Sequence, residues 1–392
     1  MPVPVFYIFA DGEDVTDRFK AGGLVSMTIT DNVGLKSDTL QIVIDDADGR
    51  IAAPKTGTVL TARGGYLDGE IRNFGQFTVD QVTFSGYPQQ IQIDAQSVAA
   101  ASTAKQQRPK DYRKEEYPTY GDIFKEVAGR AGLSLSISSE VASIKVEYEA
   151  QGEEKELEFA ARLGRKLDAF VSIKSGRMFV APRGSGLSAS GQQMPTIVVA
   201  RGVNLLDYSA TWMDKPKHST VKATWYDRKK NKQETVEEST DMDGPDYLIR
   251  EPYQTEEEAK QAAKTKAGQL KRAQANASFS IDGAPSASAG AFVICSNTRP
   301  GVDGAWYAKT VTHNFLSSGP YTTSLDCEVP SKGARKSGDS KSPGASGGSS
   351  GSSGGGAGGN GGNGSTGTNS GGSAPETPTA PPFKPWSRID LA

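Results

Sequence analysis

The stretch Thr39-Leu40-Gln41-Ile42-Val43-Ile44-Asp45 shows the pattern that decides the fold of the N-terminal part of the chain. Its apolar residues at 40, 42 and 44 recur with the period of two expected of a strand with one buried face. Similar short runs surround it at residues 5–9, 24–30, 59–62, 74–84 and 91–95. Turn-forming dipeptides such as Asp11-Gly12 and Asp48-Gly49 separate these runs. We therefore expect residues 1–108 to form a small antiparallel β barrel or sandwich.

The apolar period changes to that of a helix after Thr119, which can cap it. Apolar residues at 123, 124, 127, 128 and 131 then share one helix face, and Gly132 provides a stop. A second helix is predicted over residues 153–168, followed by strands at 171–174 and 177–180. Residues 109–200 are therefore predicted to be an α+β insert.

Strand patterns return at residues 205–212, 219–226, 277–281, 291–295, 305–313 and 321–329. A helix over residues 255–274 interrupts them, and its start, Thr255-Glu256-Glu257-Glu258, fits a capping box. Its narrow apolar stripe, Ala259, Ala262, Ala263 and Leu270, suits close packing against a sheet or a neighbouring subunit, and we favour a core role. Residues 201–330 are predicted to form a second β domain that contains this helix.

The composition becomes rich in Gly, Ser, Asn and Pro from Ser331 onward. Such a sequence cannot bury enough apolar surface to offset the entropy of ordering, so residues 331–380 are predicted to be a disordered linker. Residues 381–392 follow it and include four large apolar side chains: Phe383, Trp386, Ile389 and Leu391. These residues form either a docking peptide on a tether or a solvated end with a few apolar residues.

The overall charge is close to neutral, because 44 Lys and Arg nearly balance 46 Asp and Glu, leaving a formal charge of -2. A protein that grips phosphates is usually more basic, so we expect no specific nucleic-acid binding. No apolar run approaches the roughly 18 residues of a spanning helix, and the N-terminus lacks the layout of a secretory signal. We expect no direct membrane insertion and folding in the cytoplasm where the chain is made.

The residues that could carry chemistry form no convincing constellation. His218 and His313 are the only histidines, and neither has a second metal ligand at helical spacing. The acidic turns at residues 45–49 and 241–244 lack the carboxylate that a calcium loop needs at its twelfth position. Ser219 adjoins His218, but neighbours on a strand point to opposite faces. We assign no catalytic, cofactor-binding or metal-binding residue, and no cofactor.

Three smaller features complete the sequence. Gly184-Ser185-Gly186 and the later Gly/Ser tracts lack the spacing of a phosphate-binding loop and are interpreted as loops. The basic runs at residues 228–232 and 332–341 are interpreted as solvated, with contact to an acidic partner surface as the alternative. Cys295 and Cys327 are expected to be buried thiols, and a bridge between them on neighbouring strands stays open.

The order of the predicted elements resembles that of the late control D family of contractile-tailed phages. The resemblance covers roughly residues 1–330 and is strongest after Tyr253. Its motifs are Tyr253-Gln254-Thr255-Glu256-Glu257-Glu258-Ala259, Ala277-Ser278-Phe279-Ser280-Ile281-Asp282-Gly283, Arg299-Pro300-Gly301-Val302-Asp303-Gly304-Ala305-Trp306, Val311-Thr312-His313 and Tyr321-Thr322-Thr323-Ser324-Leu325. Residues 117–123 are a weaker match, and the Gly/Ser tract lies outside the resemblance.

The resemblance implies a non-enzymatic baseplate hub similar to the N-terminal part of the type VI secretion spike protein. Such a hub is a homotrimer whose two barrel domains per chain, flanking the α+β insert, make a ring with near-sixfold symmetry. The ring would join the hexameric tail tube to the trimeric spike, contact other baseplate proteins and surround a lumen through which DNA passes. It implies assembly in the host bacterial cytoplasm and a place in the tail baseplate of a phage or a phage-derived tailocin.

Two functions of other classes remain as alternatives. A tail-associated cell-wall hydrolase would need a pair of carboxylates in a cleft. A carbohydrate-binding tail module would expose aromatic rings, for which Trp212, Trp225 and Trp306 are the candidates. Burial of all three tryptophans would exclude the second alternative.

Overall fold

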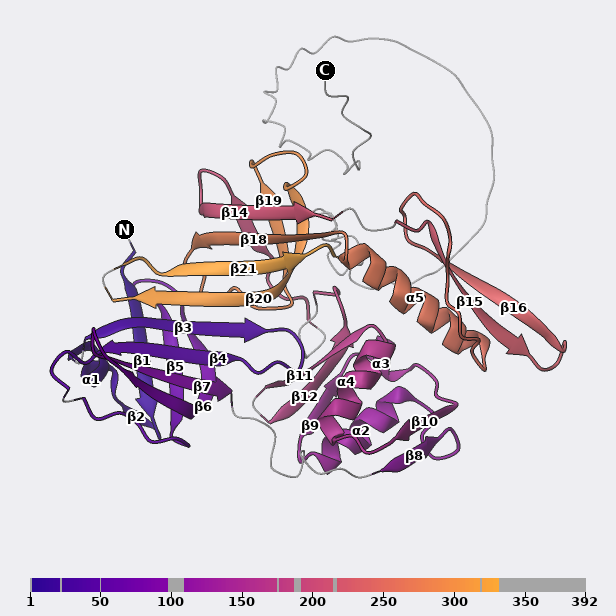
Figure 1. Cartoon of the computed structure of the whole chain (residues 1–392), viewed down its shortest axis with the longest axis horizontal. Coiled ribbons are helices and arrows are strands. Elements are labelled where there is room, and N and C mark those ends of the chain that lie inside the picture. Colours follow the sequence, from indigo (N-terminus) through magenta and orange to yellow (C-terminus); the bar gives the residue numbers. More distant parts are fainter. Residues whose placement is uncertain are drawn as a thin grey trace, which may run out of the picture. The chain divides into compact units, whose positions relative to one another are not determined.

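The computed structural model describes residues 2–21, 23–49, 51–97, 109–174, 176–186, 192–213, 217–317 and 319–330. The predictions for residues 331–380 and 381–392 therefore concern residues outside the described part. Strands predominate in the described part and helices are few, so the protein is mainly β (Figure 1). No helix in this part is long and apolar enough to cross a membrane.

The first β unit contains the strands that the N-terminal pattern predicts. Its strands pair in the order β3-β4-β7-β6-β5-β1, with the short β2 on the edge of β1. Their bounds are β1 Pro4–Ala10, β2 Glu13–Asp14, β3 Leu24–Asn32, β4 Thr39–Asp45, β5 Val59–Tyr66, β6 Ile71–Ser85 and β7 Gln90–Ser97, with helix α1 at Thr16–Ala21. Leu40, Ile42 and Ile44 are all buried in its core, which confirms the alternation in β4.

The second β unit contains six strands, against six long strands and the short β2 in the first unit. They follow the order β13-β19-β20-β21-β18-β14, and an isolated bridge between Arg201 and Leu205 connects the ends of this series. The bounds are β13 Ile197–Ala200, β14 Leu205–Trp212, β18 Ala275–Asp282, β19 Phe292–Ser296, β20 Gly304–Leu316 and β21 Thr322–Glu328. Phe279, Trp306 and Leu325 lie in its core, separate from that of the first unit.

Strand β20 joins the two β units into one thirteen-stranded sheet. Residues 304–307 of β20 pair with β19, whereas residues 310–316 pair antiparallel with β3. The two sets of six strands are therefore adjacent parts of one hydrogen-bonded sheet, each with its own core.

The insert combines three helices with two small sheets. Strand β9 pairs parallel with β12, β12 pairs antiparallel with β11, and β8 pairs with β10. The bounds are β8 Lys110–Arg113, α2 Tyr120–Arg130, β9 Ser134–Ile137, α3 Ser139–Ala142, β10 Tyr148–Gln151, α4 Glu156–Lys166, β11 Ala169–Lys174 and β12 Arg177–Pro182.

The predicted cap of α2 is confirmed in detail. The Thr119 hydroxyl accepts the Asp122 amide, and the Asp122 carboxylate accepts the Thr119 amide at 3.0 Å, so two of the otherwise unpaired amides at the helix start are satisfied. At the other end Gly132 has a φ of +71°, the left-handed conformation that glycine adopts most readily.

Residues 217–272 form a smaller unit of their own. Strands β15 (Thr220–Asp227), β16 (Lys232–Ser239) and β17 (Tyr247–Leu248) make a separate sheet, against which helix α5 (Glu256–Arg272) packs. Ala259 and Ala263 of the small-residue stripe are buried there beside Val221 and Ala223, which confirms its core role. Of the predicted capping box, the threonine half is formed: the Thr255 hydroxyl accepts the Glu258 amide at 3.2 Å.

Candidate functional site

The contacts that fix the parts of the chain to one another are the candidate functional features, because the sequence pointed to no catalytic centre. The first of them lies under the β3–β20 pairing. His313 of β20 is fully buried, with its Nδ1 2.7 Å from the Tyr321 hydroxyl and its Nε2 3.2 Å from the Ala287 carbonyl. Since a carbonyl only accepts, Nε2 carries the proton and Nδ1 accepts from Tyr321. Burial and the nearby Arg72 lower the pKa of His313 to about 3, so the ring is neutral.

A charged cluster around Asp31 connects the first β unit to the insert and to residues 283–291. The Asp31 carboxylate is 2.5 Å from the Lys174 ammonium of β11 and 3.6 Å from the Arg72 guanidinium of β6. It also accepts the Ala289 amide at 3.1 Å. Arg72 in turn donates to the Pro285 carbonyl at 3.0 Å. Asp31 therefore links four separate segments through one buried carboxylate.

The electrostatics of this Asp31 cluster favour a charged lysine. Burial lowers the pKa of Lys174, because it disfavours the charged ammonium. The carboxylates of Asp31 and Asp38 raise the pKa by more, so that it lies above its ordinary value. Burial raises the pKa of Asp38, and the ammonium 3.2 Å away only partly offsets this. The insert is thus attached to β3 by a lysine that stays protonated at neutral pH.

A second junction attaches the insert to α5. Arg272, buried in the last turn of α5, grips the Asp168 carboxylate with both guanidinium nitrogens, one of them at 3.0 Å. Its Nε lies 3.7 Å from Glu328 of β21. Gln261 donates to the Leu167 carbonyl at 3.0 Å, and the Thr265 hydroxyl donates to the Lys166 carbonyl at 3.1 Å. The end of α4, helix α5 and the second β unit therefore meet at one point.

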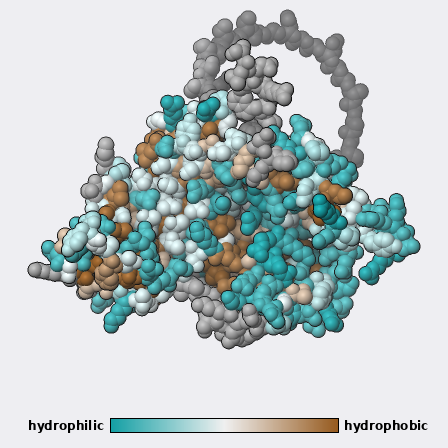
Figure 2. All heavy atoms as spheres, viewed as in Figure 1, coloured by the Kyte–Doolittle hydropathy of each residue, from teal (hydrophilic) through white to brown (hydrophobic). Residues whose placement is uncertain are grey.

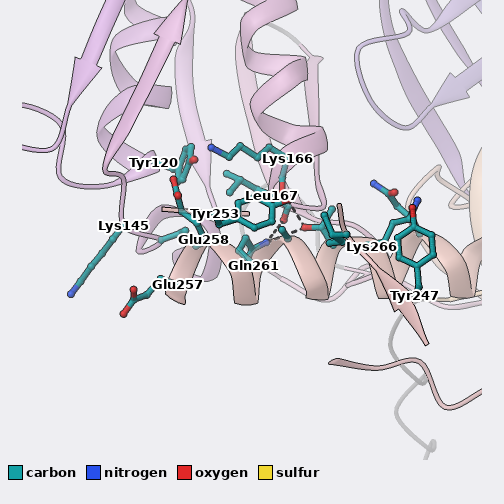
Figure 3. A pocket seen from close by; sticks show the side chains of 15 residues that line it. Tyr120, Lys145, Lys166, Leu167, Tyr247, Tyr253, Glu257, Glu258, Gln261 and Lys266 are labelled. Atoms are coloured by element: carbon teal, nitrogen blue, oxygen red, sulfur yellow. Dashed lines mark hydrogen bonds between the residues drawn. The ribbon is translucent and has the colours of Figure 1, made fainter. Parts of the chain in front are cut away.

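A groove of about 340 Å³ runs along this second junction, and Figure 3 shows its lining from both sides. Tyr120, Lys166 and Leu167 line it from the insert, while α5 presents Glu258, Gln261 and Lys266. The Tyr120 hydroxyl donates to the buried Glu149 at 2.6 Å, and burial together with that carboxylate raises the pKa of Tyr120. The groove is lined by aromatic rings and by both signs of charge.

The residues weighed for chemistry are separated in the structure. His218 is half-buried at the surface of the unit formed by residues 217–272, with Nδ1 3.1 Å from the Pro245 carbonyl, whereas the buried His313 belongs to β20. In the acidic turn at 45–49, Asp45 and Asp46 accept the amides of Ala47 and Ile51, the usual bonds of such turns. Among the described residues, no group of three or more His, Cys, Asp or Glu side chains is arranged to hold a metal ion.

The tryptophans and cysteines occupy mostly interior positions. Trp306 is buried and Trp225 half-buried, whereas Trp212 is 43% exposed, with its indole nitrogen donating to the Gly301 carbonyl at 2.9 Å. Of the three tryptophans only Trp306 is buried, so the condition that would exclude a carbohydrate-binding module is not fulfilled. Cys295 and Cys327 are both buried free thiols, which confirms the favoured interpretation. Burial raises the pKa of each thiol.

The basic run at 228–232 forms the exposed turn between β15 and β16, with the amides of Lys229 and Lys230 donating to Asp227. The ion pairs at the two junctions, in contrast, were not found from the sequence. Lys174 lies 143 residues from Asp31, and Arg272 lies 104 residues from Asp168. No local pattern marks such partners, since each of these charges alone resembles an ordinary surface residue.

Comparison with known proteins gives a consistent result. A sequence model of the family described as "Phage tail baseplate hub (GPD)" matches residues 46–318. The probable baseplate hub proteins of Escherichia phages P2 and 186 are 28% and 27% identical to this chain over 372 residues, covering 83% of it and 93% of each relative. The 43 kDa tail protein of prophage MuSo2 from Shewanella oneidensis has a similar fold, with a TM-score of 0.62 at 14% identity over 84% of this chain and 99% of that one.

The family match covers more than half of the chain and agrees with the motifs after Tyr253. The order of the strands and the insert agrees with the fold of the prophage tail protein. The chain therefore belongs to the phage tail baseplate hub (GPD) family and is a structural, non-enzymatic hub protein in the baseplate of a contractile phage tail.

Proposed function

We propose that this hub protein is a homotrimeric adaptor that joins the hexameric tail tube to the trimeric spike. The observation that supports this most directly is that each chain contains two β units of six main strands each, the first with the short β2 in addition, fixed in one sheet by the β3–β20 pairing. Three such chains supply six β units, so a threefold assembly can present six similar surfaces to a hexameric ring. Each β unit is a barrel-like domain, and the edge strands and loops of both units contact the tube on one side and the spike on the other.

The domain boundaries of this proposal follow the sequence. Residues 1–108 form the first barrel domain, residues 109–200 the insert, whose last strand β13 pairs with β19 of the second β unit, and residues 201–330 the second barrel domain, within which the β15–β17 sheet and α5 are an elaboration. The separate cores of the two β units support this division. The insert faces other baseplate proteins, and its groove along α5 provides a surface with aromatic and charged groups for such a contact.

The proposed ring surrounds the path of the DNA. A formal net charge of -2 on 392 residues supports this, because a strongly basic lumen would retain the phosphate backbone. The protein makes no specific contact with nucleic acid and does not insert into a membrane in this proposal.

Residues 381–392 are proposed to dock on a tail partner, since Phe383, Trp386, Ile389 and Leu391 follow a Gly/Ser tether. Deleting residues 374–392 should then reduce assembly or infectivity of the particle. Unchanged assembly and infectivity would refute the docking role and leave the adaptor role untouched.

The adaptor role is tested by the mass in solution of the full chain, alone and mixed with its spike protein, measured by light scattering on a sizing column. A trimer, or a complex of three chains with three spike chains, is the expected result. A monomer that does not bind the spike protein would refute the adaptor role. It would reopen the carbohydrate-binding alternative, for which Trp212 provides an exposed aromatic ring.

A further inference from the structure

Two groups of exposed apolar side chains lie at the two ends of the thirteen-stranded sheet. The β1 patch consists of Val3, Leu67 and Ile71, which are 53%, 55% and 44% exposed. The Leu67 amide donates to the Val3 carbonyl at 2.9 Å, and Ile71 begins β6 directly after the turn that holds Leu67. The patch therefore surrounds the start of β1, at one end of the sheet.

The β14 patch consists of Val198, Val203 and Leu206, which are 59%, 78% and 55% exposed. Asn204 connects the segments that contain these residues: its side-chain nitrogen donates to the Val198 carbonyl at 2.8 Å, and its side-chain oxygen accepts the Ala200 amide at 2.9 Å. Leu206 belongs to β14, the last strand at the other end of the sheet. Figure 2 shows that apolar side chains reach this face of the molecule in small groups among polar ones.

Both ends of the sheet also offer unused backbone groups. In the part of the chain that the structure describes, β14 pairs along its length with β18 alone, and the bridge at Leu205 occupies the first residue of its other edge. Strand β1 pairs with β5 on one side. On the other side β2 covers Phe9 and Ala10, and the backbone of Ile8 bonds to Val15 and Thr16, so the open part of this edge lies before Ile8. Open edges beside exposed apolar side chains are sites where strands of another chain add.

The charges beside the two patches differ, and this decides which patch meets which. Exposed Asp68 and Glu70 flank the β1 patch, whereas the β14 patch has Arg201 and Asp207 beside it. Contact of two β1 patches would bring four carboxylates together. Contact of a β1 patch with a β14 patch adds the counter-charge of Arg201 and only the one further carboxylate of Asp207, so it is less repulsive than contact of two β1 patches, and charge across an interface selects the partner surface.

We propose that the β1 patch of one copy of this chain packs on the β14 patch of the next copy. The contact joins two different surfaces, so it repeats head to tail and closes into a ring. This inference rests on the proposed trimer, because the trimer sets the number of copies at which the ring closes. It adds the surfaces, which neither the family match nor the likeness to the prophage tail protein assigns.

Two full-chain variants, Leu67→Asp and Val203→Asp, each disable one patch, and Leu248→Asp serves as a control because Leu248 is 57% exposed on β17, outside both patches. Light scattering should find Leu67→Asp and Val203→Asp as monomers and Leu248→Asp as a trimer. An equimolar mixture of the two patch variants should form dimers and nothing larger, since each mixed pair retains one intact contact. Ile71→Lys and Leu206→Lys replace either variant that fails to fold by circular dichroism.

The outcomes separate this inference from the adaptor role. Trimers in both patch variants would overturn the proposed contact while the trimer itself stands. Assembly of one patch variant without the other would overturn the head-to-tail pairing, because a single patch would then pair with itself. A wild-type chain that stays monomeric with its spike would refute the adaptor role and the ring together.

The charge argument has its own test. Arg201→Glu should weaken trimer formation about tenfold at low salt, and adding Glu70→Arg to the same chain should restore most of it. Equal trimer formation in all three proteins would overturn the charge pairing as the reason for the choice of surface.

Discussion

Asp168 and Arg272 form a two-point ion pair at a position where the backbone of Asp168 is itself unusual. Asp168 follows the end of α4 with a φ of +51°, in the left-handed region where helices usually place glycine or asparagine. Its carboxylate contacts both terminal nitrogens of Arg272, and Gly268 on α5 provides the space, since a Cβ there would come within 2.7 Å of the carboxylate. The side chain at this turn therefore joins two units that a glycine would leave unconnected.

Asp168→Asn should destabilise the protein by about 2–4 kcal/mol, because asparagine tolerates the left-handed backbone but leaves Arg272 buried without its close counter-charge. The free energy of unfolding from urea titration measures this. Asp241→Asn is the matched control, since it removes the exposed partner of Lys271 and should cost less than about 1 kcal/mol. Equal losses in the two variants would contradict a special role of the Asp168–Arg272 pair.

Lys174→Met should loosen the insert from the first β unit and cost about 1–2 kcal/mol, because Asp31 keeps Arg72 and the Ala289 amide as partners. Hydrogen exchange of the β11 amides should become faster in this variant. The exposed pair of Lys114 and Glu147 gives the control: Lys114→Met should leave both measurements near the wild-type values.

Stability should fall with acid because of His313. Its pKa is about 3 in the folded chain against an ordinary value of 6.5, so between these values the unfolded chain binds the proton and the folded chain does not. The stabilisation is present above pH 6.5 and is lost as the pH falls toward 3, at up to about 1.4 kcal/mol per pH unit. Unfolding midpoints measured across this range check the expectation.

Replacement of each histidine separates this effect from acid unfolding by other groups. His313→Gln should flatten the loss between pH 6.5 and 3, although the protein is less stable throughout. His218→Gln should keep the wild-type slope, because His218 is on the surface. An unchanged slope in His313→Gln would show that the carboxylates alone govern the acid response.

Gly64→Ala should destabilise the contact of β5 with β20. A Cβ at Gly64 would come within 2.5 Å of the Phe315 ring, which is stacked on Tyr321 at 4.1 Å and cannot readily move. We expect a loss of about 1–3 kcal/mol in thermal unfolding. Gly129→Ala, in the last turn of α2 with open space around it, should instead stabilise by up to about 1 kcal/mol. We expect changes in stability of opposite sign in the two variants, and a change of the same sign in both would contradict the close contact of Gly64 with Phe315.

The local features of the fold could be predicted from the sequence because they depend on neighbouring residues. The alternation in β4, the cap at Thr119, the stop at Gly132 and the start of α5 at Thr255 are all formed. The pairing of β15 with β16 and β17 in a separate sheet was not predicted, because half of the residues of β16 are charged and its only large apolar residue is Val236.

The junctions could not be predicted, for a different physical reason. Asp31, Arg72 and Lys174 come from three strands, and their side chains meet because the sheets place them together. The sequence alone contains nothing that distinguishes the buried Asp31 from the exposed Asp45 of the next strand. The structural role of His313 is easier to predict from the sequence, since an isolated histidine in an apolar strand is usually a buried structural residue, as His313 is.

The shared strand β20 also determines how the protein responds to mechanical load. Residues 310–316 run alongside β3, so a force that draws the two β units apart along the strand direction acts on the backbone hydrogen bonds of this segment in shear. In that geometry the bonds resist together and must break nearly at once, whereas a force across the strands would open them in succession. A protein of a contractile tail is thus expected to resist load best along the direction of the strand pairing that joins its two β units.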